Sequence, residues 1–449
     1  MKNLHTLLSV ASVVALVGCA NGSVPEPAPG PSAVANPAPS PANLGALAGD
    51  VTPVSIHARG SLAIARDLVQ VSQPVSPKDK IFDEGAPEWA LSTDALNLVA
   101  KGTATSEIAI DDTSGEAMLY LVPQAEGSLV DDALAGLEVF DPDGVQINKR
   151  AFKAGTKATP MPSVALAGHK PGIYRIKHST IAQRFALAVD ARLMSSKLVM
   201  KMKPSTLQHL YGNTTTVDVM LEDNGAPVTG AKLAVSLVDP ELKPGNRVQV
   251  TEIGGGIYRA DVSKSFGVGD RVGAWLVDVR AEGRTAAGTP FLRHGRTGFH
   301  FGVPTAKISS VGAVHAITND KGITTGFAAD LELDSASLDR LEISGTLAAL
   351  GSDGAEHPVA LAFSGGGYGA GKHTVTLTFD ASYVRMTHLA GPYVLRNVKL
   401  FSLGTNTLFQ RIGNGENRVV SGPRLEQLAL PKMTPALEQL VTEGTLFDK

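Results

Sequence analysis

The densest group of side chains that could bind a ligand or a metal is the run Arg293-His294-Gly295-Arg296-Thr297-Gly298-Phe299-His300. In an extended strand, His294 and His300 would lie ~20 Å apart at ~3.3 Å per residue, too far to share a metal ion. A turn at Gly295 or Gly298 would bring them closer, but two histidines are too few for a metal site. Two interpretations remain: a solvated basic hairpin, or a patch that binds an acidic glycan or acidic protein surface through Arg284, Arg293, His294, Arg296 and His300.

Carboxylate pairs form the second set of candidates. Asp141 and Asp143 lie in the sequence Asp-Pro-Asp-Gly, and adjacent aspartates occur at 111–112 and 131–132. Calcium prefers roughly six to eight oxygen ligands, whereas Asp-Pro-Asp-Gly is first of all a good β-turn. We therefore predict a turn and no metal, with Asp141 and Asp143 as calcium candidates only if distant loops supply further carboxylates. A carboxylate pair for glycoside hydrolysis stays open, because only its spatial separation would reveal it.

Motifs of several enzyme classes do not occur in the sequence. It contains no Gly-x-Ser-x-Gly, no His-Glu-x-x-His and no glycine fingerprint for nucleotides. The glycine-rich run Ser364–Gly369 lacks the Lys and Ser/Thr of a phosphate-binding loop, so we interpret it as a flexible hairpin loop. The sequence therefore predicts no cofactor and favours binding over catalysis, while a hydrolase with unfamiliar carboxylate chemistry stays an alternative.

Composition limits the class of protein further. The formal net charge is -3, which gives no basis for binding nucleic acid. The chain has 449 residues, 47 glycines and 27 prolines, and its apolar residues fall in short runs of Val, Leu, Ile and Ala. Frequent turns between short apolar runs predict an all-β chain, and this length predicts two to four domains at roughly 100–150 residues each.

Cys19 is the only cysteine of the chain, and it follows Leu16-Val17-Gly18. Upstream lie Lys2 and an apolar run that is shorter than the ~20 residues of a membrane-spanning helix. This segment resembles the lipobox of bacterial lipoprotein precursors; a membrane anchor and an ordinary secretory signal are the alternatives. The resemblance implies that residues 1–18 are a signal peptide, that Cys19 is acylated, for example with palmitate, and that the protein is attached to the outer membrane of the cell envelope, since no Asp follows Cys19.

Residues 19–54 are rich in Pro, Ala, Gly and Ser, which predicts a disordered tether with polyproline II character. Strand patterns then recur in three segments, 55–192, 193–305 and 306–420. We expect three β-sandwich modules in series, immunoglobulin-like or jelly-roll-like. The stretch 95–102 fits either a short helix or an edge strand. The tail, 421–449, is expected to contain a short helix near Leu437.

Each segment resembles a known kind of sandwich. Asp141–Gly144 followed by Gly172-Ile173-Tyr174 resembles small domains that accompany secreted bacterial peptidases. Ala226–Ala231 followed by Gly256-Ile257-Tyr258 resembles bacterial immunoglobulin-like domains, which implies that the Tyr258 hydroxyl ties a loop. Thr374–Asp380 with Gly391–Leu400 resembles the closing strands of C-terminal sandwiches of secreted bacterial proteins.

The whole arrangement is similar to an uncharacterised family of exported proteins from Gram-negative bacteria that has an immunoglobulin-like domain. From these observations we expect a lipid-anchored envelope or cell-surface protein that binds a partner protein or a glycan. A peptidase-associated accessory protein and a structural or assembly factor of the envelope are the alternatives, because a fold alone does not decide function.

Overall fold

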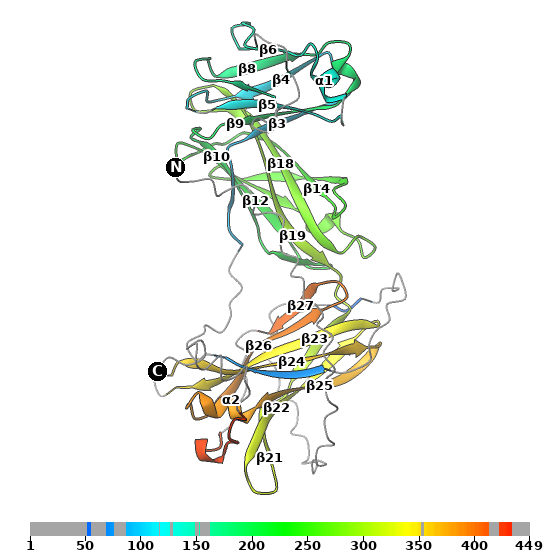
Figure 1. The fold of residues 1–449 in the computed structure, drawn as a ribbon, viewed down its shortest axis with the longest axis vertical. Coiled ribbons are helices and arrows are strands. Elements are labelled where there is room, and N and C mark those ends of the chain that lie inside the picture. Colours follow the sequence, from blue (N-terminus) through cyan, green and yellow to red (C-terminus); the bar gives the residue numbers. More distant parts are fainter. Residues whose placement is uncertain are drawn as a thin grey trace. The chain divides into compact units, whose positions relative to one another are not determined.

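The computed structural model describes residues 52–54, 69–75, 87–115, 117–125, 129–148, 152, 162–351, 354–412 and 422–432. Within these residues nearly all regular structure is β-strand, arranged in six mainly antiparallel sheets (Figure 1). The buried apolar side chains form three separate clusters, each enclosed by two sheets. The predicted all-β fold of several sandwiches is thereby confirmed.

The first sandwich encloses the cluster that contains Leu119, Ile176 and Val189. Strand β8 explains how its sequence forms one wall: along Gly-Ile-Tyr-Arg-Ile-Lys, buried and exposed residues alternate, as a strand with one face on a core requires. One sheet contains β3 (Ala95–Val99), β9 (Leu187–Arg192), β5 (Met118–Pro123) and β7 (Ser163–Ala165). The other contains β4 (Thr105–Ile110), β8 (Gly172–Lys177) and β6 (Glu138–Phe140). The short helices are α1 (Leu129–Leu134) and η1 (Ala182–Arg184).

The stretch that fitted either a helix or an edge strand is the edge strand β3, which pairs only with β9.

The second sandwich encloses the cluster that contains Met200, Val219 and Val277. Its first sheet has the order β16 (Val250–Gly254), β17 (Ile257–Asp261), β12 (Thr216–Asp223), β10 (Leu198–Pro204) and β2 (Ala90–Ser92), with β13 (Ala226–Pro227) paired to β12. Its second sheet has the order β11 (Gln208–Leu210), β19 (Pro290–Gly302), β18 (Gly273–Arg284), β14 (Lys232–Val238) and β15 (Pro244–Val248). The short helix η2 (Ser263–Ser265) follows β17.

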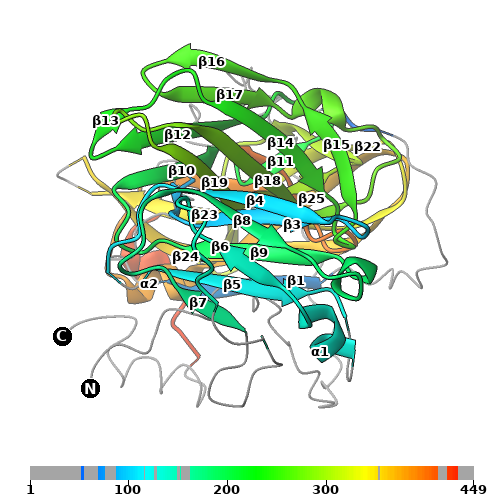
Figure 2. The ribbon, with the colours of Figure 1, turned by 90° about the horizontal axis from the view of Figure 1, so that it is seen from above.

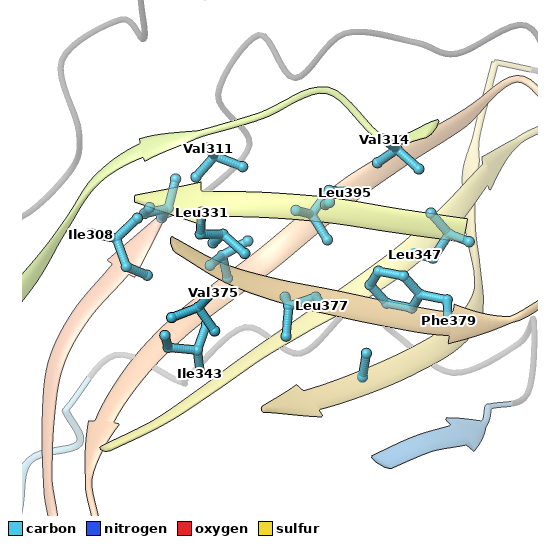
Figure 3. Close-up of a cluster of buried hydrophobic side chains, with 14 of the residues drawn as sticks. Ile308, Val311, Val314, Leu331, Ile343, Leu347, Val375, Leu377, Phe379 and Leu395 are labelled. Carbon is cyan, nitrogen blue, oxygen red and sulfur yellow. The ribbon is translucent and has the colours of Figure 1, made fainter. Parts of the chain in front are cut away.

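The third sandwich encloses the largest of the three clusters. Figure 3 shows side chains from both of its sheets in this cluster, among them Ile343, Leu347 and Leu395 from one and Leu331, Val375 and Phe379 from the other. One sheet has the order β1 (Val69–Pro74), β24 (Glu356–Tyr368), β23 (Asp339–Leu350), β26 (Tyr393–Ser402) and β27 (Thr407–Ile412). The other has β20 (Ala306–Val311), β22 (Thr324–Ser335), β21 (His315–Thr318) and β25 (Gly371–Asp380). The short helices are α2 (Ala381–Met386) and η3 (Leu425–Gln427).

The hydroxyl of Tyr258 ties a loop, as expected. It donates to the carbonyl of Val228 at 3.1 Å and accepts from the N–H of Ala231 at 2.9 Å. In the first and third sandwiches, Tyr174 and Tyr393 each donate to the carbonyl four residues upstream, both at 3.0 Å. These buried hydroxyls are therefore satisfied by backbone groups, and in each sandwich they fasten a connection that leads into a strand.

Two strands from the segment expected in the first module belong to other sheets. β1 pairs with β24, with Val71 opposite Phe363, and Ser72 Oγ accepts from the N–H of Asp380 (Figure 1). β2 pairs with β10, with Ser92 opposite Met200. Alternation along a short strand indicates only that it is a strand, since the choice of sheet depends on contacts far along the chain. The pairing partners of β1 and β2 therefore could not be predicted from the sequence of these strands alone.

The glycine-rich run Ser364–Gly369 was expected to be a hairpin loop, and this expectation is wrong. Residues 364–368 belong to β24, where Ser364 lies opposite Ile343 and Gly365 lies between β23 and β1. Ladder hydrogen bonds are made by backbone groups, so pairing with β23 along the run, and with β1 as far as Gly365, holds the glycine segment extended despite its low propensity for strand. The predicted lipobox, nearly all of the predicted tether and the predicted C-terminal helix lie outside the described residues.

None of the helices in the described part of the chain has the length and apolar character needed to cross a bilayer.

Candidate functional site

The predicted basic patch lies on a strand, not in a turn. β18 and β19 pair continuously from Gly273 opposite Phe301 to Arg284 opposite Pro290, so residues 293–300 are extended. Successive side chains of a strand point to opposite faces. Phe291, Phe299 and Phe301 belong to the core of the second sandwich, which makes theirs the inner face of β19. Arg293 shares that face by position, whereas His294, Arg296 and His300 lie on the other face.

Arg293 is fully buried, which excludes it from a surface patch. Its Nη1 and Nη2 donate to the two carboxylate oxygens of Asp111 at 2.7 and 2.8 Å. Nε donates to the carbonyl of Leu198 at 3.0 Å, Nη1 also to that of Leu292 at 2.8 Å, and Nη2 also to Ser196 Oγ at 2.6 Å. All five N–H groups of the guanidinium therefore have an acceptor, which is the condition under which a buried arginine is tolerated.

His294 and Arg296 share one acceptor, Asp278 on β18. His294 Nε2 lies 2.8 Å and Arg296 Nε 2.7 Å from the same carboxylate oxygen. Partial burial of Asp278 opposes ionisation, but the hydrogen bonds from His294 and Arg296 outweigh it and hold the pKa of this carboxyl below its ordinary value. The guanidinium of Arg296 and the imidazole of His294 are thus both directed to the protein's own carboxylate.

Arg284 and His300 lie apart from this group. Arg284 Nη1 donates to the carbonyl of Gly288 at 2.7 Å, at the hairpin that joins β18 to β19. His300 Nε2 lies 3.0 Å from Thr407 Oγ1 of β27, and its burial lowers its pKa. The five residues of the predicted patch are therefore distributed over different environments and do not form one surface.

The calcium candidates do not converge either. Asp141 Oδ1 accepts from the N–H groups of Asp143 and Val145, as in the predicted turn, and its Oδ2 lies 3.1 Å from His169 Nδ1. Asp143 pairs instead with Lys170 at 3.0 Å. Burial would raise the pKa of Asp141, yet these hydrogen bonds lower it. Among the described residues no three His, Cys, Asp or Glu side chains are grouped closely enough to hold a metal ion.

A hollow of about 500 Å³ lies on the second sandwich, where the chain passes from β15 in one sheet to β16 in the other. Both strands are the outermost of their sheets, β15 beyond β14 and β16 beyond β17 (Figure 2). The hollow is lined by Arg247, Val248, Gln249, Thr251, Ile253, Arg259, Asp261, Lys264 and Ser265. Its position at a corner between two sheets brings β15, β16, β17 and η2 to one place.

Three cations line this hollow, and they differ in their partners. Arg259 is held by Asp218, with two hydrogen bonds of 2.7 and 2.9 Å. The side chains of Arg247 and Lys264 are exposed, and neither side chain makes a hydrogen bond or a close ion pair within the described residues. Asp261 is engaged by Ser263, whose hydroxyl lowers its pKa, with a smaller contribution from the charge of Lys264. Arg247 and Lys264 are thus available to an anion from solution.

Sequence reasoning missed this hollow. Arg247 in β15 and Lys264 in η2 are single cations, 17 positions apart by their numbers, and no motif connects them. They meet only because β15 and β16 belong to different sheets, and the sequence does not indicate that change of sheet.

One further carboxyl, that of Asp94, has a shifted pKa. Burial raises it, and so does the negative charge of Asp190, while Arg192, Arg293 and His294 act in the opposite direction. Asp94 lies beside the predicted patch, since its carbonyl accepts from the N–H of His294 at 2.9 Å. It does not line the hollow described above.

Comparison with known proteins finds a match to a described domain family in the C-terminal part of the chain. Residues 309–414 match the family "Domain of unknown function (DUF4785) C-terminal domain". The chain is also similar to the crystal structure of a DUF4785 family protein from Legionella pneumophila, with a TM-score of 0.61 and 14% identity over 86% of this chain and 100% of that one. At this identity the similarity establishes a shared fold and nothing about activity.

Two other solved structures are much less similar. A Bacillus licheniformis lipase in propeptide form has a TM-score of 0.26 and 12% identity over 49% of this chain and 44% of that one. An Escherichia coli alpha-2-macroglobulin activated by porcine elastase has a TM-score of 0.20 and 11% identity over 74% of this chain and 31% of that one. TM-scores this low carry no argument about fold or function. No curated protein matches the chain.

Proposed function

We propose that this protein is a non-catalytic lipoprotein of the bacterial envelope that binds an anionic envelope component through the hollow of its second sandwich. The observation that carries the proposal is the pair Arg247 and Lys264, which line a concave surface without a close carboxylate partner. A cation already paired within the protein gains little from a second anion, whereas an unpaired one retains its full attraction.

The lipid anchor is the second part of the proposal. It rests on the lipobox-like Leu16-Val17-Gly18-Cys19 and on the Pro-rich segment that follows it. Such a segment reaches ~3.1 Å per residue in polyproline II form, so some thirty residues would hold the sandwiches up to roughly 100 Å from a bilayer. An outer-membrane location agrees with Ala20 and Asn21 after the cysteine.

Binding is tested with the full chain carrying Cys19→Ser, applied to a dextran sulfate column and eluted with salt. We expect the double variant Arg247→Gln/Lys264→Gln to elute at clearly lower salt, because attraction to a polyanion depends on unpaired cations. The matched control is Arg280→Gln/Arg296→Gln, which removes the same charge from arginines that are paired with carboxylates of the protein, Glu282 and Asp278. Equal shifts for both variants would mean unspecific attraction and would overturn the proposal.

Anchoring is tested by growing cells that express the chain with an alkyne fatty acid and by separating membranes from soluble material. The native chain should carry the label and remain with the membranes, while Cys19→Ser should lose both. A Cys19→Ser protein that stays in the membrane fraction in undiminished amount would refute the lipid anchor without affecting the binding proposal.

A further inference from the structure

The uncharged residues that line the hollow indicate which class of anion fits it. Besides the cations and Asp261, whose carboxylate is hydrogen-bonded by Ser263, the lining contains three neutral polar side chains, those of Gln249, Thr251 and Ser265. Ile253 adds an apolar surface and is 49% exposed. Amides and hydroxyls hydrogen-bond to sugar hydroxyls, and an aliphatic side chain packs against the C–H face of a sugar ring. The lining therefore matches a ring that carries hydroxyls on its edge and an acid group at one position.

The size and openness of the hollow agree with such a ligand. Its volume of about 500 Å³ is within the roughly 300–1,000 Å³ of small-molecule sites, enough for one or two sugar rings. It lies at the margin of two sheets, so a longer chain could enter and leave it without obstruction from a neighbouring strand.

An extended acidic peptide is the competing ligand, because the outermost strand β16 offers an edge for strand addition. Two features of β16 oppose this mode. Its pairing with β17 shifts register between Glu252 and Gly254, and the strand ends in the run Gly254-Gly255-Gly256, where all three residues have positive φ. Irregular, short edges of this kind are poor templates for an added strand.

We infer that the hollow binds a sugar residue of an acidic saccharide, a ring that carries a carboxylate or a phosphate group. This inference rests on the proposed anion binding and names its ligand class. Arg247 and Lys264 bind the acid group, Gln249, Thr251 and Ser265 bind ring hydroxyls, and Ile253 contacts the ring face.

The test is calorimetric titration of the full chain carrying Cys19→Ser with five probes. These are trigalacturonate, glucose 6-phosphate, neutral maltotriose, inorganic phosphate and a hexaglutamate peptide. We expect at least one acidic sugar to bind and maltotriose not to bind. Binding of trigalacturonate alone identifies a carboxylate ligand, binding of glucose 6-phosphate alone identifies a phosphate ligand, and either supports the inference.

Two variants locate the binding. Arg247→Ala should weaken the acidic sugar about tenfold or more, because a charge-assisted hydrogen bond is lost. Ile253→Ser should weaken the sugar severalfold but leave retention on dextran sulfate unchanged, which separates ring recognition from charge. Arg296→Ala, with its acceptor on β18, should stay within about twofold, and thermal unfolding of each variant confirms that it is folded.

Three results would overturn the inference. These are binding of hexaglutamate without any sugar, equal binding of inorganic phosphate and glucose 6-phosphate, or no binding of any probe. In each case a loss of dextran sulfate retention in Arg247→Gln/Lys264→Gln would still support the proposed function, so the two failures are distinguishable.

Discussion

Two arginines on opposite faces of β19 differ in their exposure and in the number of their hydrogen-bond acceptors. Arg293, on the inner face, has a side chain with 0% exposure and five acceptors, including both oxygens of Asp111. Arg296, three positions later on the outer face, is 51% exposed and pairs with Asp278 together with His294. The difference shows that spacing along a strand determines the face, while burial and the number of acceptors determine what a charge contributes.

The largest effect is expected from Arg293→Met. The substitution leaves the Asp111 carboxylate, with 4% side-chain exposure, without its cation, and the Ser196 hydroxyl remains as a donor to it. It also removes the arginine from the carbonyls of Leu198 and Leu292. We expect a loss of ~3–5 kcal/mol in the free energy of unfolding, the usual consequence of an unpaired buried charge. Urea denaturation measures it. In the double variant Arg293→Met/Asp111→Leu most of this loss should be recovered, and a single variant within ~1 kcal/mol of the native protein would contradict the account.

The second largest effect is a dependence of stability on pH that arises from the buried His209 of β11. His209 is 1% exposed among Phe266, Phe299 and Phe301, and burial lowers its pKa to about 4. Because the folded pKa lies below the unfolded value of 6.5, the unfolded chain binds the proton more readily as pH falls. Stability should therefore be full above pH ~6.5 and fall by ~3 kcal/mol toward pH ~4.

The pH effect is measured by denaturation at a series of pH values for the native protein and for His209→Phe. The variant should lose the ~3 kcal/mol that His209 contributes between pH ~6.5 and ~4, since it has no proton to bind at this position. The contributions of His178 and His300, whose pKa values burial also lowers, remain. If His209→Phe had the same pH dependence as the native protein, groups other than His209 would be its cause.

A smaller effect is expected from Gly302→Ala, at the end of β19. A Cβ atom added to Gly302 would clash with Cγ2 of Thr407, a fully buried residue whose hydroxyl is hydrogen-bonded to His300. Relief of this contact requires a shift of β19 or β27, at a cost of ~1–3 kcal/mol. Thermal unfolding measures the change. Gly288→Ala is not a suitable control, because Gly288 has a φ of +83°, where any side chain is strained. Gly269→Ala, with open space around the new Cβ, is the matched control.

The smallest effect is expected from Arg296→Ala. Asp278 keeps His294 as a partner, and the arginine is half exposed, so the loss should be below ~1 kcal/mol and should shrink in high salt. A loss as large as that of Arg293→Met would remove the distinction between the two faces of β19.

Local patterns predicted the strands, and long-range contacts account for what they missed. Short apolar runs between frequent turns predicted the all-β chain, and the Gly-Ile-Tyr context of Tyr258 predicted its tied loop. The burial of Arg293 was not predictable, because its partner Asp111 lies 182 positions away in the sequence. A strand pattern predicts which residues share a face, but not what lies opposite that face.

The pairing of β1 with β24 has a mechanical consequence for a chain held at Cys19. Before β1, Val54 already contacts the second sandwich: its N–H donates to the carbonyl of Pro304 at 2.8 Å, and its side chain packs against the core of that sandwich. The hydrogen bonds between Val69–Pro74 and Ala360–Gly365 then connect the chain to the third sandwich, together with the bond from Asp380 to Ser72. Tension from the proposed anchor would therefore load the second and third sandwiches before the first.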